Sequence, residues 1–190
     1  DRNSIMLFKD TTLTFESDKI TINDTGEEVM MDWEDSLMSA SAAYVTQGGG
    51  DILEIGFGMG IAAGYVHSHS ISSHTIIENH PQILEKLKTW SGGKSNVTII
   101  SQSWADVTGS LSTYDGIFYD TYGDDRNYLF SSSLSGLTKS GTKATFWNNN
   151  KNESNDLNIS NCTYQQISTT PSPNLYFTGS TIYYMPKKEF

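Results

Sequence analysis

The stretch Asp51-Ile52-Leu53-Glu54-Ile55-Gly56-Phe57-Gly58-Met59-Gly60-Ile61 decides the fold class of this chain. An apolar, strand-like run passes directly into three alternating glycines, and the helix-compatible segment 61–66 follows. Glycine lets the backbone turn sharply and approach a ligand without a Cβ in the way. A helix that begins beyond the turn presents free N–H groups and the positive end of its dipole. The stretch therefore predicts a nucleotide-type cofactor site at the carboxyl end of a first parallel strand.

The spacing of the glycines narrows the class of cofactor. A dinucleotide fingerprint places its third glycine where this chain has Ile61, whereas the third glycine here is Gly60. The resulting Gly-x-Gly-x-Gly pattern, with Glu54 before it, resembles the first motif of class I S-adenosylmethionine-dependent methyltransferases. Segment 74–78 indicates a second strand ending in Glu78, whose carboxylate can accept hydrogen bonds from both ribose hydroxyls of a cofactor. The alternative is a glycine-rich turn that binds nothing.

Composition limits the partners and the compartment. The chain has 190 residues, enough for one domain with a core, and its only cysteine is Cys162, so no internal disulfide is expected. Acids outnumber bases by 22 to 12, and this negative charge repels nucleic acid and anionic membranes, so neither is an expected partner. No stretch approaches a membrane span or a secretion signal, which favours a cytoplasmic protein. The four histidines lack ligand spacing, so no metal site is expected.

The order of predicted elements indicates a doubly wound, Rossmann-like sheet. Strands and helices alternate after residue 50, which argues for a mostly parallel sheet, and the last strand is expected to be antiparallel. A small N-terminal β-hairpin element (residues 1–28) is expected to pack on a single methyltransferase-like domain (residues 29–190). Helices are expected at 34–45, 61–66, 81–90 and 129–137, and strands within 5–22 and at 51–55, 74–78, 96–101, 114–120, 141–147, 163–167 and 175–185; residues 148–158 are expected to form a polar loop.

A second motif makes the resemblance more specific. The block Val29-Met30-Met31-Asp32-Trp33-Glu34-Asp35-Ser36-Leu37-Met38 precedes the glycine loop by one helix. With that loop, it resembles the guanidinoacetate methyltransferase family and the related arginine methyltransferase of fungi and plants that modifies the δ-nitrogen. The family's next landmarks follow in order at 76–78, 104–107 and 114–122, so the resemblance extends from about residue 29 to about residue 148.

The resemblance implies S-adenosyl-L-methionine as the cofactor. The residues that would contact it are Met30, Met38, Glu54, Gly56, Phe57, Gly58, Met59, Gly60, Ile61, Glu78, Asn79, His80, Trp104, Ala105 and Asp120. Glu78 would hold the ribose, with the adenine beside Asn79 and His80 and bordered by Trp104 and Ala105. In the family, the acids that match Glu34 and Asp120 grip the guanidinium of the substrate. The polar run around Asn149 and Asn150 is a further candidate for binding a substrate carboxylate or amide.

Departures from the family and local alternatives qualify this interpretation. The family often has an acid where this chain has Ala105, and the segments after Asp120 and after the fifth core strand are shorter than usual. The substrate pocket is therefore expected to be more open, or to be completed by a second subunit in a homodimer. Glu34 alone could be a helix-start acid, Asp120 a turn residue and Met30 a core residue.

These observations predict an S-adenosylmethionine-dependent N-methyltransferase that acts on a small guanidino or amino compound. Two carboxylates, Glu34 and Asp120, are the right type to orient a cationic acceptor and to accept its proton. A protein-bound arginine is another acceptor of the same class. Two other classes stay open: an aminopropyltransferase-like enzyme that uses the decarboxylated cofactor, and a non-catalytic cofactor-binding module.

Overall fold

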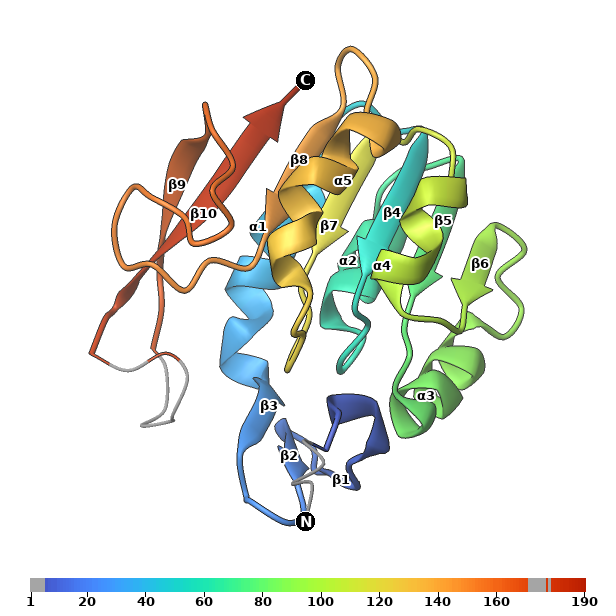
Figure 1. Ribbon diagram of the computed structural model, residues 1–190, viewed down its shortest axis with the longest axis vertical. Coiled ribbons are helices and arrows are strands. Elements are labelled where there is room, and N and C mark those ends of the chain that lie inside the picture. The colour runs from blue at the N-terminus through green and yellow to red at the C-terminus, as the bar shows by residue number, and fades with distance from the viewer. Residues whose placement is uncertain (1–5, 171–176, 178) are drawn as a thin grey trace, which may run out of the picture.

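The computed structural model describes residues 6–170, 177 and 179–190. Within these residues the strands form a seven-stranded sheet ordered β6-β5-β4-β7-β8-β10-β9 and a three-stranded sheet ordered β1-β2-β3 (Figure 1). The large sheet contains β4 (Asp51–Ile55), β5 (Ser73–Ile77), β6 (Val97–Ile100), β7 (Gly116–Tyr119), β8 (Lys143–Phe146), β9 (Thr163–Ser168) and β10 (Ile182–Glu189).

The large sheet confirms the expected doubly wound topology. Strands β6, β5, β4, β7 and β8 pair in parallel, while β10 pairs antiparallel with both β8 and β9. The strand order reverses between β4 and β7, because β5 and β6 lie on one side of β4 and β7 and β8 on the other. Ligands of doubly wound sheets bind at such a switch point, outside the carboxyl ends of the strands.

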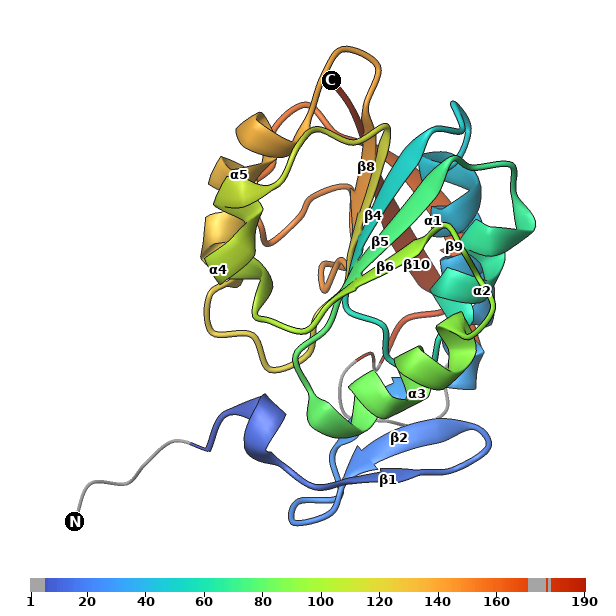
Figure 2. The same cartoon turned by 90° about the vertical axis from the view of Figure 1, so that its right-hand side faces the viewer.

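Helices cover both faces of the large sheet (Figure 2). Helices α1 (Asp35–Val45), α2 (Ile61–Ser68) and α3 (Pro81–Ser91) lie on one face, and α4 (Trp104–Val107) and α5 (Phe130–Leu137) on the other. Because successive side chains of a strand point to opposite faces, Ile52 packs among residues of α1 and α2 while its neighbour Leu53 packs with Phe130 of α5. Two-sided burial explains the continuous apolar runs of the central strands.

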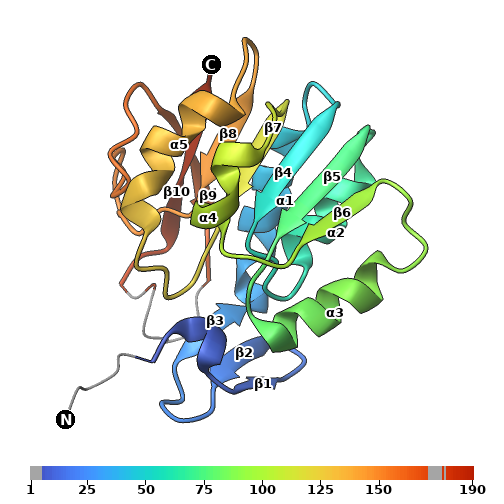
Figure 3. The same ribbon diagram turned by 45° about the vertical axis from the view of Figure 1, so that its right-hand side comes forward.

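The N-terminal element is a three-stranded antiparallel sheet of β1 (Leu13–Phe15), β2 (Lys19–Ile22) and β3 (Glu28–Met31). Leu13 and Ile20 pack with Ile83 of α3 and with Phe57 of the glycine loop. The small sheet lies beyond the carboxyl ends of the parallel strands (Figure 3). The expected boundary between residues 28 and 29 falls inside β3, and the division into two parts stays a prediction.

Several local expectations were wrong. The apolar run 5–8 does not form a strand over its described part, since Phe8–Asp10 is a 3-10 turn; Ile5 lies outside the described residues. The strand expected at 175–185 begins only at Ile182, after Gly179 with φ of +73°, and 175, 176 and 178 lie outside the described residues. The short helix α4 was not expected. Residues 148–158 contain no helix or strand, as expected.

Candidate active site

A cavity of about 840 Å³ lies at the carboxyl ends of the parallel strands. Its wall includes the glycine loop after β4, Glu78 after β5, Asp120 after β7 and Trp147 after β8. The N-terminal segment 7–9 and strand β3 contribute further lining residues. The sheet thus gathers at one edge side chains that are far apart in the sequence, because parallel strands end on the same side.

The glycine loop is shaped first by the chain's own atoms. Gly56 has φ of +93°, and a Cβ there would come within 1.8 Å of the carbonyl oxygen of Asp120. Gly58 has φ of +56°, and a Cβ there would lie 2.5 Å from the sulfur of Met30. That sulfur accepts a hydrogen bond from the backbone N–H of Met59 at 3.2 Å. The glycines are therefore needed to bring the loop against β7 and β3.

Glu78 ties the glycine loop to the second strand. Its carboxylate accepts backbone N–H groups from Phe57, Asn79 and His80, each at 3.0 Å. Glu78 is buried at 7% exposure, yet it lines the cavity. A carboxylate with two oxygens has room for about four hydrogen bonds, so one position remains for a ligand hydroxyl.

Two of the predicted acidic residues meet in this cavity. Glu34 precedes α1, is buried, and accepts the Met31 N–H at 3.3 Å; Asp120 follows β7, and both line the wall. The pKa of the Tyr183 hydroxyl depends on the charges of both acids. Burial raises the pKa of Tyr183 on β10, and the charges of Asp120 and Glu34 raise it further. Glu34 and Asp120 thus line one cavity, although they come from different elements.

Asp120 is poised to exchange a proton near neutral pH. Burial, followed by repulsion from the Glu54 carboxylate, raises the pKa of Asp120 from its ordinary value of 3.8 to about 7. Its side chain keeps partial exposure, which opens to the cavity. A carboxyl group in this state can bind a cation as an anion and can also accept a proton.

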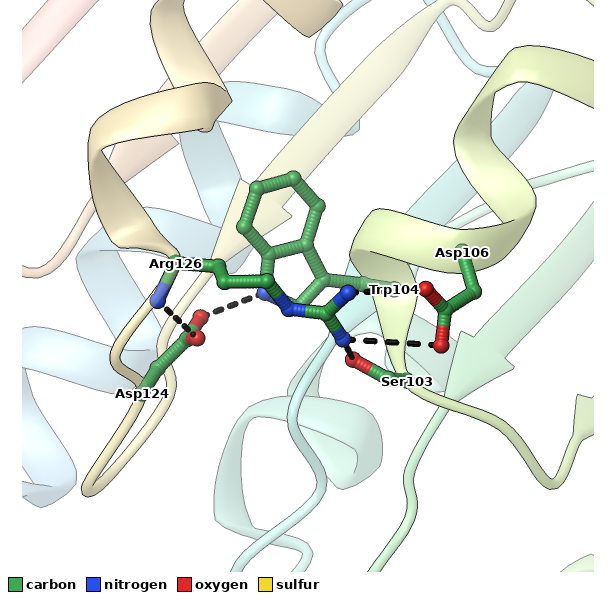
Figure 4. A network of polar contacts seen from close by, with 5 residues as sticks. All are labelled: Ser103, Trp104, Asp106, Asp124 and Arg126. Carbon is green, nitrogen blue, oxygen red and sulfur yellow. Dashed lines mark hydrogen bonds and ion pairs between the residues drawn. The ribbon is translucent and has the colours of Figure 1, made fainter.

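A polar network of Ser103, Trp104, Asp106, Asp124 and Arg126 forms another part of the cavity wall (Figure 4). Asp124, in the loop after β7, accepts hydrogen bonds from the indole N–H of Trp104, from the Tyr119 hydroxyl at 2.7 Å and from the Arg126 backbone at 2.9 Å. The Arg126 guanidinium reaches across to α4, where it pairs with Asp106 at 2.7 Å and bonds to Ser103. Sequence reasoning missed this network; the run Asp124-Asp125-Arg126 after a strand-end turn was the available signal.

Aromatic side chains pack around Trp147, which lines the cavity. The ring centroid of Trp147 lies 5.1 Å from that of Tyr183 and 6.0 Å from that of Phe177. Trp33 stacks on Phe177 at 5.7 Å. These rings belong to one hydrophobic cluster, and Trp147 is the one of these four rings that lies in the cavity wall.

The structure brings most of the predicted residues to one cavity. Those that line it are Met30, Glu34, Met38, Glu54, Gly56, Phe57, Gly58, Glu78, Asn79, Trp104, Asp120 and Asn149. Those that do not line it are Met59, Gly60, Ile61, His80, Ala105 and Asn150.

Local contacts explain two of the residues outside the lining. The His80 ring caps α3 by accepting the Gln82 N–H at 3.2 Å, and its other nitrogen lies 3.0 Å from the carbonyl of Thr11. The Asn150 amide donates to the Ser154 hydroxyl in the exposed loop. The expected contacts of these two side chains with ligands gain no support from the geometry.

Among residues 6–170, 177 and 179–190, no three or more His, Cys, Asp or Glu side chains are grouped so as to hold a metal ion. None of the helices in this part of the chain has the length and apolar character needed to cross a membrane.

The sequence comparisons identify relatives of the chain. The family model described as guanidinoacetate N-methyltransferase matches residues 3–143. A protein arginine N-methyltransferase 2 from Aspergillus oryzae is 35% identical over 84% of this chain and 40% of its own length. The protein of the same name from Kluyveromyces lactis is 30% identical over 95% of this chain and 52% of its own length. The chain thus spans about two fifths to one half of these curated relatives.

Solved structures share the fold at low sequence identity. A spermidine synthase from Thermotoga maritima matches with a TM-score of 0.63 at 13% identity, over 94% of this chain and 72% of that one. A caffeoyl-CoA O-methyltransferase-like protein from Staphylococcus aureus matches with a TM-score of 0.51 at 20% identity, over 60% of this chain and 57% of that one. These similarities establish the class I methyltransferase fold and nothing about the acceptor.

Proposed function

The chain belongs to the guanidinoacetate N-methyltransferase family, and on that premise we propose that it transfers a methyl group from S-adenosyl-L-methionine to a nitrogen of a guanidino or amino compound. The observation that carries this proposal is the shared cavity of Glu34, Asp120 and the glycine loop. The relatives named as protein arginine N-methyltransferases support an arginine-like acceptor.

The residues of the cavity fit the proposed cofactor. The volume of about 840 Å³ suits a nucleoside-sized ligand together with a small acceptor. Glu54, a fully buried residue in the wall, has one carboxylate oxygen, Oε1, without a hydrogen-bond partner among the described residues. A buried polar atom in this state indicates that a ligand supplies the missing partner. S-adenosylmethionine supplies, when bound, a methyl group already activated by a positively charged sulfur.

We assign the cofactor contacts as the family resemblance implies. Glu78 would hold the ribose, Met30 and Met38 the methionine end, and Trp104 the adenine. The loop Gly56–Ile61 would surround the remainder, although the side chain of Ile61 starts α2 and does not line the cavity. Trp104 is fixed for such a contact because Asp124 holds its indole N–H.

Glu34 and Asp120 would position the acceptor and take up its proton. A guanidinium is protonated at neutral pH and is a poor nucleophile, so the enzyme must fix its plane and remove a proton. Two carboxylates can do both, the first by charge-assisted hydrogen bonds and the second as a general base. Asp120 suits the role of base, because its pKa of about 7 lies near physiological pH.

A screen of acceptors tests this proposal. Purified protein would be incubated with the labelled cofactor and with guanidinoacetate, arginine, glycine, putrescine or an arginine-containing peptide, and methyl incorporation would be measured. Methylation of a guanidino compound is the expected result. Methylation of the peptide alone would indicate that the acceptor is a protein-bound arginine. An absence of methylation of all the tested compounds would contradict the proposal.

An aminopropyltransferase is the second candidate, because a spermidine synthase shares the fold and the cavity is acidic. That reaction uses a cofactor without the methionine carboxylate. Mass spectrometry of ligand retained through purification distinguishes the two: a carboxylated cofactor or its demethylated product supports the methyltransferase, and the decarboxylated form supports the alternative.

A further inference from the structure

Glu54, in the wall of the cavity, forms a buried pair with His74. Both side chains have 0% exposure, and Nε2 of His74 lies 2.8 Å from Oε2 of Glu54. The other oxygen of Glu54 and Nδ1 of His74 have no partner among the described residues. An unpartnered Nδ1 fits the tautomer with its proton on Nε2, since a buried and unsatisfied N–H would be costly.

Strand register places His74 on the same face of the sheet as Glu54. Glu54 of β4 is paired with Ile76 of β5 and with Phe118 of β7. His74 stands two residues before Ile76, and Asp120 stands two residues after Phe118. Side chains two apart on a strand point to the same face, which places His74 on the face of Glu54. Asp120 directly follows β7 and lines the same cavity as Glu54. The pKa of Asp120 is raised by burial first and then by the charge of Glu54.

Few other titratable groups face this pair. Burial raises the pKa of Glu54, the hydrogen bond with His74 lowers it, and the charge of Glu78, the residue after β5, raises it. On α2, the His67 ring lies 5.3 Å from the His74 ring, and burial lowers the pKa of His67, as do His74 and Lys94. His74 is therefore the one side chain of the described residues that donates a hydrogen bond to Glu54.

We propose that His74 and Glu54 are positioning residues that control the charge of Asp120: the Nε2–H of His74 holds Glu54 as an anion, and that anion keeps a proton on Asp120 until a cationic acceptor enters. The cation then offsets the repulsion between the two carboxylates, Asp120 releases its proton to solvent, and the ionised pair of Asp120 and Glu34 grips the acceptor. The last step rests on the proposed function, whereas the control of Asp120 by His74 and Glu54 does not.

The test is an NMR titration of Asp120 in the protein without ligand. Protein labelled with ¹³C at the aspartate carboxyl groups is titrated from pH 4 to pH 9, and the signal of Asp120 is assigned by its loss in Asp120→Asn. Wild type, Glu54→Gln, His74→Phe and the double variant are compared. Glu85→Gln serves as the matched control, because it removes the same charge from an exposed residue of α3 that pairs with Lys88 at 3.1 Å.

The proposal expects a definite pattern of midpoints. Glu54→Gln removes the repelling charge, so the Asp120 midpoint falls by about one pH unit or more. His74→Phe removes the donor, Glu54 takes up a proton, and the midpoint falls in the same direction. The double variant matches Glu54→Gln, because His74 acts only through Glu54. Glu85→Gln leaves the midpoint in place.

Other outcomes overturn the proposal. An unchanged midpoint in Glu54→Gln removes the pair from control of Asp120, and a fall in Glu54→Gln without one in His74→Phe removes His74. If His74→Phe does not fold, ¹⁵N shifts of the wild-type imidazole decide the matter: a proton on Nε2 supports the proposal, and a proton on Nδ1 alone contradicts it. Because no turnover is measured, an absence of methyltransferase activity in the acceptor screen would leave this result intact.

Discussion

At the scale of single residues, the cavity concentrates acidic side chains from different elements. Glu34, Glu54 and Asp120 all line one wall, and two of them are buried. Buried acids without a cation cost stability, since each must lose its hydration or take up a proton. A fold keeps such groups where a ligand uses them, which supports a cationic acceptor.

Amide variants of Glu34 and Asp120 test whether these two acids bind the cationic acceptor. Glu34→Gln and Asp120→Asn keep the size of each side chain and remove its charge. Charge-assisted hydrogen bonds are worth ~1.5–3 kcal/mol each, so acceptor turnover is expected to fall about ten- to a hundredfold in each variant. Cofactor affinity, measured by calorimetry, is expected to change less for Glu34→Gln than for Asp120→Asn. Asp35→Asn is the control, because Asp35 is exposed and accepts from Tyr65 at 2.8 Å. Full activity in both amide variants would refute the clamp.

The pH dependence of stability gives a second test of Asp120. Its pKa rises from 3.8 to about 7 on folding, so the folded state binds the proton more tightly than the unfolded state does. This contribution to stability is present below about pH 4 and is lost as the pH rises through about 7. Asp120→Asn is therefore expected to equal wild type near pH 4 and to exceed it by roughly 1–3 kcal/mol at pH 8 in urea unfolding. A constant difference across this range would exclude the raised pKa.

At the scale of elements, the loop after β7 is held in place by side chains rather than by a sheet. Asp124 joins that loop to Trp104 of α4 and to Tyr119 of β7, and Arg126 adds a second tie to α4 (Figure 4). The loop consequently forms a wall of the cavity without regular structure of its own. Positions of this kind carry function on a rigid scaffold.

Replacement of Asp124, which accepts the central hydrogen bonds of this network, is expected to loosen the cavity wall. Asp124→Asn leaves the Trp104 indole and the Tyr119 hydroxyl with a weaker acceptor, and the free energy of unfolding is expected to fall by about 1–3 kcal/mol. Cofactor affinity should fall with it, because Trp104 loses its fixed orientation. Asp18→Asn makes the same charge change at an exposed residue that does not line the cavity, and thermal melts with and without cofactor should leave it near wild type. Equal effects of the two variants would attribute the change to net charge alone.

At the scale of the whole molecule, cavity and small sheet depend on one another. The sheet β1-β2-β3 packs on α3 and on the glycine loop, and β3 supplies Met30 to the cavity. The family match from residue 3 includes this sheet, so it is part of the shared architecture. A ligand in the cavity would therefore contact both sheets' elements and stabilise the folded chain as a unit.

Thermal melts with ligand test whether a ligand in the cavity stabilises the folded chain. S-adenosylmethionine and its demethylated product are each expected to raise the melting temperature, with about 2.7 kcal/mol of stabilisation at a hundredfold excess over Kd. NAD is expected to have no effect, since Ile61 replaces the third glycine of the dinucleotide fingerprint. Gly58→Val is expected to lose the response, and the Cβ clash with Met30 is a sufficient reason. A saturable NAD response that competes with the cofactor would contradict this assignment.

The sequence by itself determined the architecture and the edge at which the site lies. Strand and helix periodicities are local properties, and a glycine loop after an apolar strand admits few structures, so β4, α2, α3 and Glu78 were expected near their observed places. The positions of Glu54, Glu78 and Asp120 at strand ends followed from alternation alone. The pairing of β3 with β2, however, depends on contacts that its own sequence does not encode.

Only the tertiary structure decided which side chains meet. Glu34 comes from a turn before α1 and Asp120 from a strand end, and their shared cavity depends on how α1 packs against the sheet. His80 sits beside Glu78 in the sequence, yet its ring turns to cap α3. His74 faces Glu54 only because β5 pairs with β4 in one register. Such convergence is fixed by packing between elements distant in the chain, and local sequence carries little information about it because each element is compatible with many partners.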